Sequence, residues 1–232
     1  YNKKTSFKLN SLLLEGHHAD ITLKNTTDDN IEGAAETRLI FKDHSDSTLA
    51  QIHGRHNGTS DDSRGDLIFS TNNGNGIAEA MKINTAGYVG IGNPYPSSLL
   101  EISKAFGSAS LTLSSWSSTA TASHASILKL LKSAATSVNS AESSIHTRAG
   151  EILGRVEAWG YNHNDSPTLS SYIEFSNDAI SDADSVPGKI VFATSDADDA
   201  GTPTERMRID DDGNVGIGTN DPACRLHIKQ SD

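Results

Sequence analysis

The chain has 232 residues and a formal net charge of −11 at pH 7, with a pI near 5.2. A nucleic-acid-binding protein needs a basic face to neutralise phosphate, and an anionic membrane surface attracts basic segments, so the charge argues against both partners. No run approaches the ~18 apolar residues of a membrane span, and no secretory signal is visible. The chain starts at Tyr1 rather than Met, so we expect a fragment or a processed product.

Large apolar side chains are scarce. Ile, Leu, Val and Phe make up about one residue in five, which is close to the composition at which a chain cannot bury enough apolar surface to fold alone. Strand-like runs and turn signals are nonetheless frequent. A chain with thin apolar stripes often completes its core with another chain, so the composition predicts an oligomer.

Short runs with period-two alternation, bounded by Gly, Asn, Asp, Ser or Pro, predict an all-β protein. In chain order the runs are Ile21–Asn25, Arg38–Lys42, Asp66–Thr71, Glu79–Asn84, Gly154–Trp159, Tyr172–Ser176, Lys189–Thr194, Arg206–Asp210 and Arg225–Lys229. The Ala- and Ser-rich stretch Ala120–Ser144 leaves room for a short helix. We favour a strand at Ser126–Lys132 followed by a loose loop, because Ser, Thr and Asn are weak helix formers.

Part of the sequence occurs twice. Gly65–Ser103 matches Gly188–Lys229 in its glycines and apolar positions, which indicates an internal repeat. Upstream, Leu49–Arg55 resembles Leu153–Trp159 more weakly, whereas Ser170–Asp178 has no counterpart and looks like an added strand. We therefore expect a connecting segment at 1–18, a first β repeat domain at 19–104 and an enlarged second one at 105–232.

The glycine-rich stretch that recurs in both copies has three interpretations. A dinucleotide-binding loop needs G-x-G-x-x-G followed by a helix, but the second copy has the reverse spacing and Pro222 where a helix would begin. Clustered carboxylates at Asp196–Asp199 and Asp210–Asp212 leave a cation site open, although their spacing is not that of an EF-hand. The first copy has no carboxylate at the equivalent place, so the sequence predicts no metal site.

The third interpretation is architectural. Gly87 and Gly213 suit turns with a positive φ, and each is followed by a strand in which β-branched residues alternate with glycine. These strands consist of Val89, Gly90, Ile91 and Gly92 in the first copy and Val215, Gly216, Ile217 and Gly218 in the second. Because the glycines leave one face bare, another backbone can approach it closely. We expect an inter-chain interface there, and we expect Gly216→Val to disrupt assembly more than the local strand.

Glu205–Ile228 closely resembles a segment of many bacteriophage tail fibres and tail spikes, which reads in outline E-R-M-R-I-x-x-x-G-N-V-G-I-G-T-x-x-P-x-x-x-L-H-V. Gly188–Thr194 resembles the strand that commonly precedes this segment. Gly65–Ser103 keeps the same pattern in degraded form. The resemblance implies a homotrimeric, elongated, β-rich virion fibre, in many relatives followed by a C-terminal intramolecular chaperone. The family motif is structural and carries no catalytic residues.

Aromatic residues gather in the second copy, where a buried core is the default explanation. The alternative is a saccharide platform, since aromatic rings stack on sugars while Asn and Asp bind hydroxyls. The candidate contacts are Trp159, Tyr161, Asn162, Asn164 and Asp165. Glu151, Glu157 and Glu174 show no spacing that singles out a glycosidase pair, so we expect no enzymatic activity and no cofactor.

Together these observations predict a class and a role. The fold class is all-β, with elongated, repeat-containing antiparallel domains in a homotrimeric fibre. The function is that of a phage tail fibre protein in the virion, whose partners are other tail proteins and a host surface polysaccharide or outer-membrane receptor. The alternatives are a tail-spike depolymerase that cleaves host polysaccharide and a bacterial surface or prophage adhesin.

Overall fold

The computed structural model describes residues 21–25, 36–58, 63–116, 125–132, 146–199 and 201–230. Their regular structure consists of β-strands, which confirms the all-β class predicted from the sequence. The chain divides into two compact units, Tyr1–Thr112 and Leu113–Asp232. No helix within the described ranges has the length and hydropathy needed to cross a membrane.

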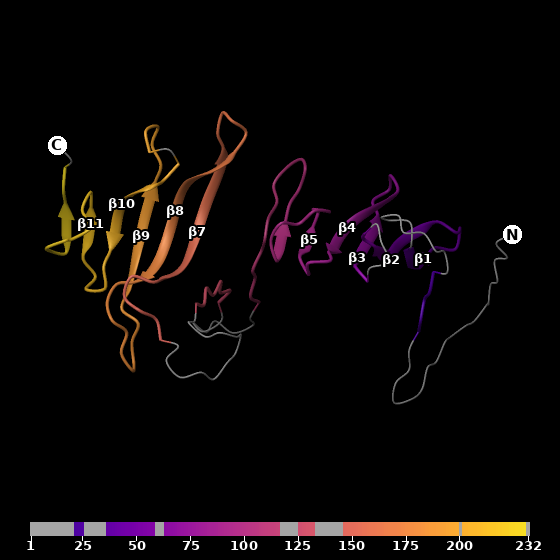
Figure 1. Ribbon diagram of the computed structural model, residues 1–232, viewed down its shortest axis with the longest axis horizontal. Coiled ribbons are helices and arrows are strands. Elements are labelled where there is room, and N and C mark those ends of the chain that lie inside the picture. Colours follow the sequence, from indigo (N-terminus) through magenta and orange to yellow (C-terminus); the bar gives the residue numbers. More distant parts are fainter. Residues whose placement is uncertain are drawn as a thin grey trace. The chain divides into compact units, whose positions relative to one another are not determined.

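The first unit contains a six-stranded sheet whose strands follow one another in chain order (Figure 1). They are β1 (Glu36–Lys42), β2 (Thr48–His56), β3 (Gly65–Asn72), β4 (Ile77–Ile83), β5 (Val89–Ile91) and β6 (Leu100–Ile102). Neighbours from β1 to β5 pair antiparallel, as predicted, but β5 and β6 pair parallel.

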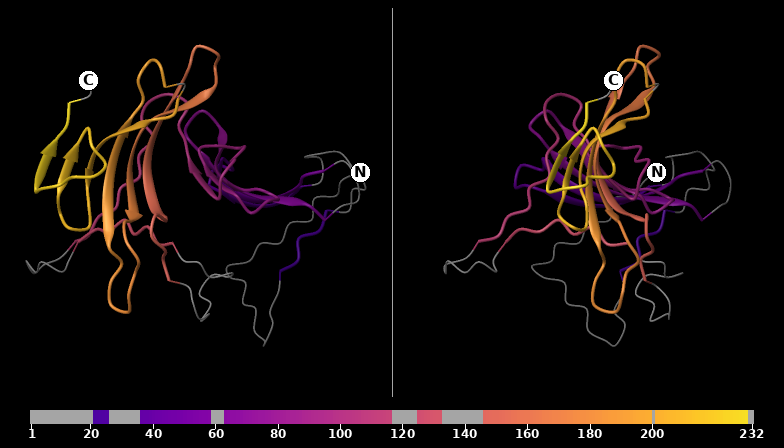
Figure 2. Two further views of the ribbon diagram at one scale, coloured as in Figure 1. Left: turned by 60° about the vertical axis from the view of Figure 1, so that its left-hand side comes forward. Right: turned by 90° about the vertical axis from the view of Figure 1, so that its left-hand side faces the viewer.

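The second unit contains a sheet of the same order and the same pairing. Its strands are β7 (Ile152–Tyr161), β8 (Pro167–Asn177), β9 (Gly188–Thr194), β10 (Thr204–Ile209), β11 (Val215–Ile217) and β12 (Leu226–Ile228). Here β11 and β12 form the parallel pair, and β7 and β8 form a long hairpin. Each sheet remains a single twisted layer of strands in the turned views (Figure 2).

The alternation of side chains along each strand produces two unlike faces. We call the face that carries Val89 and Ile91 in the first sheet, and Val215 and Ile217 in the second, the apolar face, and the opposite one the polar face. On the apolar face, cross-strand neighbours form a row over six strands: Leu39, Ile52, Phe69, Met81, Ile91 and Ile102 in the first unit, and Val156, Ile173, Phe192, Met207, Ile217 and Ile228 in the second.

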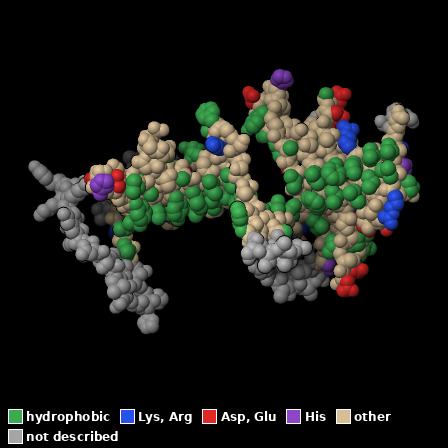
Figure 3. Space-filling model, turned by 180° about the vertical axis from the view of Figure 1, so that it is seen from behind, with side chains coloured by type: hydrophobic (Ala, Val, Ile, Leu, Met, Phe, Trp, Pro, Cys, Tyr) green, Lys and Arg blue, Asp and Glu red, His purple; other side chains and the backbone are tan. Residues whose placement is uncertain are grey.

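A second apolar row runs beside the first. It contains Leu67, Ile83, Val89 and Leu100 in the first unit, and Phe175, Ile190, Ile209, Val215 and Leu226 in the second. These apolar rows form the band of hydrophobic side chains that crosses the strands of each unit in Figure 3. Cross-strand pairs of this kind are what stabilise a sheet locally.

The buried apolar side chains of the described residues lie on the other face. In the part of the chain that the structure describes they are Ile68, Val191 and Ala193, each of which points to the polar face by its register. Many side chains of the apolar rows, in contrast, are more than a third exposed, up to 65% for Ile228, and the others are half-buried. The usual arrangement of a monomeric domain, with its large apolar residues inside, is therefore reversed.

Three predictions about local structure are wrong. Ser126–Lys132 is irregular rather than a strand, and Leu130 lies over Gly154 on the apolar face of β7. Ile21–Asn25 is irregular as well. Ser170–Asp178 is not an added strand, because all of its residues except Asp178 lie in β8, which occupies in the second sheet the place that β2 occupies in the first.

The match of Leu49–Arg55 to Leu153–Trp159 fails for the same reason. It pairs β2 with β7, whereas the strand order makes β7 the counterpart of β1. Short apolar alternations resemble one another whatever their place in a sheet, so a weak match between two of them carries little information about register.

Candidate functional site

The open apolar faces are the first candidate site, since large exposed apolar patches mark interaction surfaces. Val89, Ile91, Val215 and Ile217, which the sequence predicts at an interface, all belong to the apolar rows. Ile91 and Ile217 are about two-fifths exposed. The structure thus places the four predicted apolar residues in one kind of surface, together with row members from the other strands.

The glycines between them have a different role from the one predicted. A Cβ on Gly90 would collide with the carbonyl oxygen of Asn93, and a Cβ on Gly216 would lie 2.6 Å from the carbonyl oxygen of Thr219. The backbone that approaches the bare face is therefore the chain's own crossover into the next, parallel strand. A Val side chain at Gly216 would have to displace this crossover, so the substitution also has a local cost, and its larger effect on assembly stays a prediction.

Left-handed backbone conformations shape the same crossover. Gly87 and Gly213 have φ values of 79° and 75°, as predicted for the turn before the strand. Gly92 and Gly218 also have positive φ values, 71° and 70°, and a Cβ on either would collide with the carbonyl oxygen of Ser103 or Lys229. Only glycine adopts this conformation readily and tolerates the contact, which explains the glycine at each position of the motif.

The tip of the β7–β8 hairpin is the second candidate site. Asn162 organises it: its Oδ1 accepts the backbone N–H of Asn164 at 2.9 Å and of Ser166 at 3.1 Å, and its Nδ2 donates to Thr168 Oγ1 at 3.0 Å. Asp165 has a positive φ of 54°. The Asn162 side chain thus forms the turn, while Tyr161, Asn164 and Asp165 are exposed on it.

Trp159 lies below the tip, in an open pocket of about 530 Å³ on the polar face. The other lining residues are Arg155, Pro167, Thr168, Leu169, Tyr172, Gly201, Thr202 and Pro203. The indole ring is 58% exposed, and its Nε1 donates to Glu157 Oε2 at 2.8 Å. The pocket therefore presents an aromatic face beside hydroxyl groups and a guanidinium, the combination that suits a sugar ring.

Electrostatic interactions hold the pocket floor in place. The Arg155 guanidinium stacks on the Tyr172 ring at 4.4 Å, and its Nε donates to Glu174 Oε2 at 2.7 Å. This hydrogen bond raises the pKa of Arg155 above its ordinary value. Glu157 thus accepts a hydrogen bond from Trp159, and Glu174 accepts one from Arg155. These bonds fix the side chains of the pocket and engage both carboxylates.

The two acidic stretches serve as turns. Asp196 Oδ2 accepts Arg206 Nη2 at 2.9 Å, and Asp199 accepts the Ser195 hydroxyl and the Gly201 amide. These hydrogen bonds lower the pKa of both carboxyls. Asp210 accepts both the backbone and the side-chain N–H of Asn214. Within the described ranges no three His, Cys, Asp or Glu side chains come together as metal ligands.

Of the five predicted saccharide contacts, the structure brings only Trp159 into the pocket. Sequence reasoning missed Arg155, Thr168 and Thr202, because their proximity depends on the β7–β8 register and on a loop from β9 to β10. Arg155, Glu157 and Trp159 recur with period two, and this spacing was the available signal that they share a strand face. Trp116, the other exposed indole, lies in irregular chain outside this hairpin.

Each unit is thus a single-layer β-sheet with an open apolar face. No protein-family model and no curated protein matches the sequence. The fold is similar to that of a solved structure of the carboxy-terminal domain of the bacteriophage T5 L-shaped tail fibre with its intra-molecular chaperone domain, at a TM-score of 0.67 and 13% identity. That alignment covers 92% of this chain and 64% of the T5 chain, so the chain spans less than two thirds of it.

A second solved structure of the T5 L-shaped tail fibre carboxy-terminal domain is also similar. Its TM-score is 0.56 at 12% identity, and the alignment covers 89% of this chain and 93% of that one. At such low identity the likeness concerns the fold. The chain therefore has the fold of a phage tail fibre domain.

Proposed function

We propose that the chain is a structural segment of a phage tail fibre in the virion, and that it assembles as a homotrimer through its apolar faces. The observation that carries this proposal is the pair of open apolar rows in each unit. Each Val, Leu or Ile side chain that becomes fully buried contributes roughly 1.5–3 kcal/mol, and a half-exposed one gains about half as much. Rows that cross four to six strands thus provide a driving force for association that neither sheet can satisfy alone.

Light scattering of the purified chain tests the assembly. We expect a mass three times 24.6 kDa, and we expect Ile91→Asp and Ile217→Asp to yield smaller species because each places a charge in an apolar row. Ile180→Asp is the matched control, since Ile180 is 83% exposed and lies outside the rows. A cooperatively folded monomer at micromolar concentration would contradict the proposal.

The role in adsorption is the second part of the proposal. The Trp159 pocket and the exposed hairpin tip would contact a host surface polysaccharide, while the domains at 19–104 and 105–232 stack along the fibre axis. A depolymerase needs a carboxylate-lined groove on longer regular rungs, and the described strands form single sheets instead, so we propose binding without cleavage.

Binding to a panel of purified bacterial surface polysaccharides tests this role. For any that binds, Trp159→Ala should weaken the affinity about tenfold through lost ring stacking. Trp116→Ala is the control, because this indole is also exposed but lies outside the hairpin. Equal effects of both changes would contradict binding at the hairpin. Release of reducing ends would contradict binding without cleavage.

A further inference from the structure

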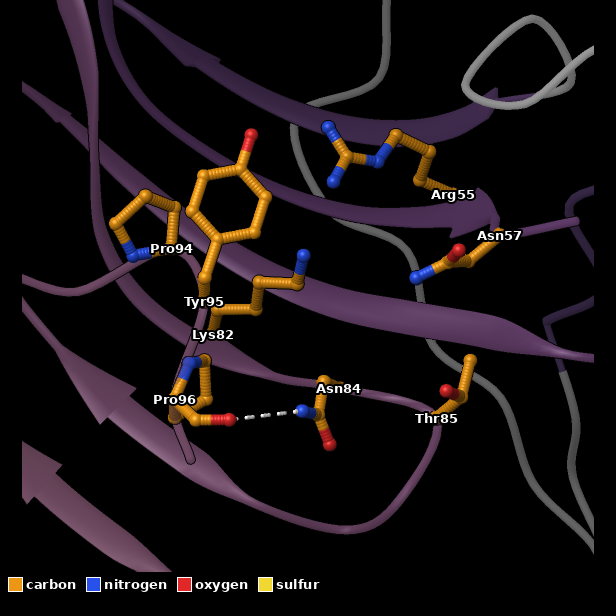
Figure 4. Close-up of a pocket in the computed structure, with 8 residues that line it drawn as sticks. All are labelled: Arg55, Asn57, Lys82, Asn84, Thr85, Pro94, Tyr95 and Pro96. Atoms are coloured by element: carbon orange, nitrogen blue, oxygen red, sulfur yellow. Dashed lines mark hydrogen bonds between the residues drawn. The ribbon is translucent and has the colours of Figure 1, made fainter. Parts of the chain in front are cut away.

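The first unit has a polar pocket of about 540 Å³ for which the fibre architecture gives no reason (Figure 4). Its lining residues are Arg55, Asn57, Lys82, Asn84, Thr85, Pro94, Tyr95 and Pro96. Arg55 and Lys82 come from β2 and β4 on the polar face, and Pro94–Pro96 belongs to the crossover from β5 to β6 that passes over this face. Association through the apolar rows would therefore leave the pocket accessible.

A buried carboxylate lies under the pocket. The side chain of Asp66 is 0% exposed, and it accepts Arg55 Nη2 at 3.1 Å and Asn57 Nδ2 at 3.0 Å, while Lys82 Nζ lies 2.7 Å away. Arg55 Nη2 and Lys82 Nζ both contact the same oxygen of Asp66, Oδ2. Asp66 thus orients both cations from below. Their remaining N–H groups are left for another acceptor.

The charges of this cluster do not balance. The lining residues include two cations and no carboxylate, so with Asp66 the cluster has a net charge of +1 in a chain whose net charge is −11. Lys82 has three N–H donors on a side chain that is only 4% exposed, and Asp66 is its salt-bridge partner in the described residues. A buried cation with spare donors is stabilised by a second anion, which a ligand can supply.

Tyr95 forms one wall of the pocket. Its side chain is 83% exposed, and Lys82 Nζ lies 5.7 Å from the ring centroid. The flanking residues Pro94 and Pro96 fix the local backbone, and Tyr95 N–H donates to Asn93 Oδ1 at 2.9 Å. Asn84 Nδ2 donates to the Pro96 carbonyl at 3.5 Å, the contact drawn in Figure 4. The backbone of Tyr95 is therefore held in place, and its exposed ring lies beside Lys82.

The second unit lacks this combination. Its crossover has Asp221 at the place of Tyr95, counted from the prolines Pro96 and Pro222. Arg208, the counterpart of Lys82 by register, pairs with its own carboxylate, Glu205, at 2.6 Å. The pocket is thus a property of the first unit rather than a requirement of the fold.

We propose that this pocket binds a carboxylated sugar, a uronate residue of a host surface polysaccharide, with the carboxylate between Arg55 and Lys82 and the sugar ring against Tyr95. The amide groups of Asn57 and Asn84 are already bonded within the protein, Asn57 Nδ2 to Asp66 and Asn84 Nδ2 to the Pro96 carbonyl, so these residues shape the pocket walls. This inference rests on the proposed adsorption role, because it names a ligand class for a second surface of the same fibre.

Binding of tetragalacturonate to the full assembled chain, measured by calorimetry or ligand-observed NMR, tests the inference. We expect binding that neutral maltotetraose does not show. Arg55→Gln, which retains a donor for Asp66, should weaken it about tenfold through the lost charge-assisted contact, and Tyr95→Ala should weaken it by a similar factor. Phe106→Ala is the matched control, because Phe106 is 91% exposed and lies outside the pocket, and it should leave binding unchanged.

Other outcomes would overturn the inference. These are an absence of tetragalacturonate binding, binding that survives both Arg55→Gln and Tyr95→Ala, and equal competition by inorganic phosphate, which would indicate an anion site without sugar recognition. The trimer mass and the effect of Trp159→Ala are measured independently. Failure at this pocket is therefore distinguishable from failure of the fibre or of the hairpin surface.

Discussion

The two units have the same sheet but different polar faces. Strand order, the parallel last pair and the left-handed glycines recur in both, and Met81 and Met207 occupy the same position in their apolar rows. On the polar face of the second unit, Arg155, Lys189 and Arg208 pair with three different carboxylates, those of Glu174, Asp178 and Glu205. In the first unit two cations share one carboxylate. The apolar rows and glycines therefore determine the fold, and the polar face can vary without changing it.

The β1–β2 and β7–β8 hairpin turns also share their geometry but differ in a polar side chain. Asp43 in the first unit accepts the backbone N–H of Ser45 and Ser47, as Asn162 does for Asn164 and Ser166 in the second. The fourth residue of each turn is an aspartate with a positive φ, Asp46 at 68° and Asp165 at 54°. An acid and an amide thus build the same turn, but only the acid can respond to pH.

Removal of the shared carboxylate should have the largest effect. Asp66→Asn leaves Arg55 and Lys82 without a counter-charge on a buried site, so we expect the free energy of unfolding to fall by about 3 kcal/mol. Asp178→Asn in the second unit removes the partner of one partly exposed lysine and should cost about 1 kcal/mol. Urea unfolding of the assembled chain measures both, and equal losses would show that the two polar faces are not energetically different.

Substitution of the crossover glycines should have the next largest effect. Gly90→Ala places a methyl group against the Asn93 carbonyl, and we expect a loss of about 2 kcal/mol. Gly216→Ala should lose slightly less, because its nearest contact is looser. Gly160→Ala is the control, since a Cβ there meets no atom within 4 Å. If thermal unfolding shows the same midpoint for all three variants, the glycines do not make room for the crossover.

Acid should destabilise the wild-type chain more than the Asp66→Asn variant. Burial tends to raise the pKa of Asp66, but its hydrogen bonds with Lys82, Asn57 and Arg55 outweigh burial and hold the pKa below the ordinary value of 3.8. A carboxyl whose pKa is lowered on folding stabilises the native state above its unfolded pKa, and this contribution is lost as the pH falls through the folded pKa. Unfolding midpoints between pH 7 and pH 2.5 check this, and parallel curves for both proteins would contradict it.

The smallest expected effect concerns the two hairpin turns. The backbone N–H of Ser47 is the main cause of the lowered pKa of Asp43, so this hydrogen bond should weaken as the carboxyl protonates below pH 3.8. The amide of Asn162 does not titrate. In NMR spectra recorded down to pH 2.5, the Ser47 amide resonance should therefore shift more than that of Ser166. Equal shifts of both resonances would contradict the assignment of the pH response to the Asp43 carboxyl.

Much of the fold follows from the sequence. Lys189–Thr194 lies in β9 as its alternation predicts, and Gly87 and Gly213 have the positive φ values that their turns require. Period and turn chemistry are local properties, so a single sequence carries them. Ser126–Lys132 was predicted incorrectly because an apolar run does not by itself provide a partner strand.

The candidate sites were less accessible to prediction. Trp159 could be singled out by its residue type, but its neighbours Thr168 and Thr202 come from other elements. The pocket at Tyr95 was missed altogether, because Arg55 and Lys82 approach it only through the pairing of β2, β3 and β4. A pocket of this kind depends on tertiary register, and neither composition nor spacing specifies that register.

The strand order also has a kinetic consequence. In the described sheets each strand pairs with the strands next to it in the chain, so the loops that must close are short. Chains dominated by such local contacts reach their pairing quickly, at a rate that does not depend on protein concentration. Burial of the apolar rows against other chains is a collision-limited step instead. Refolding should therefore show a fast phase in which strands form and a slower phase that accelerates with concentration, and dilution would lengthen the time during which an aggregation-prone surface is exposed.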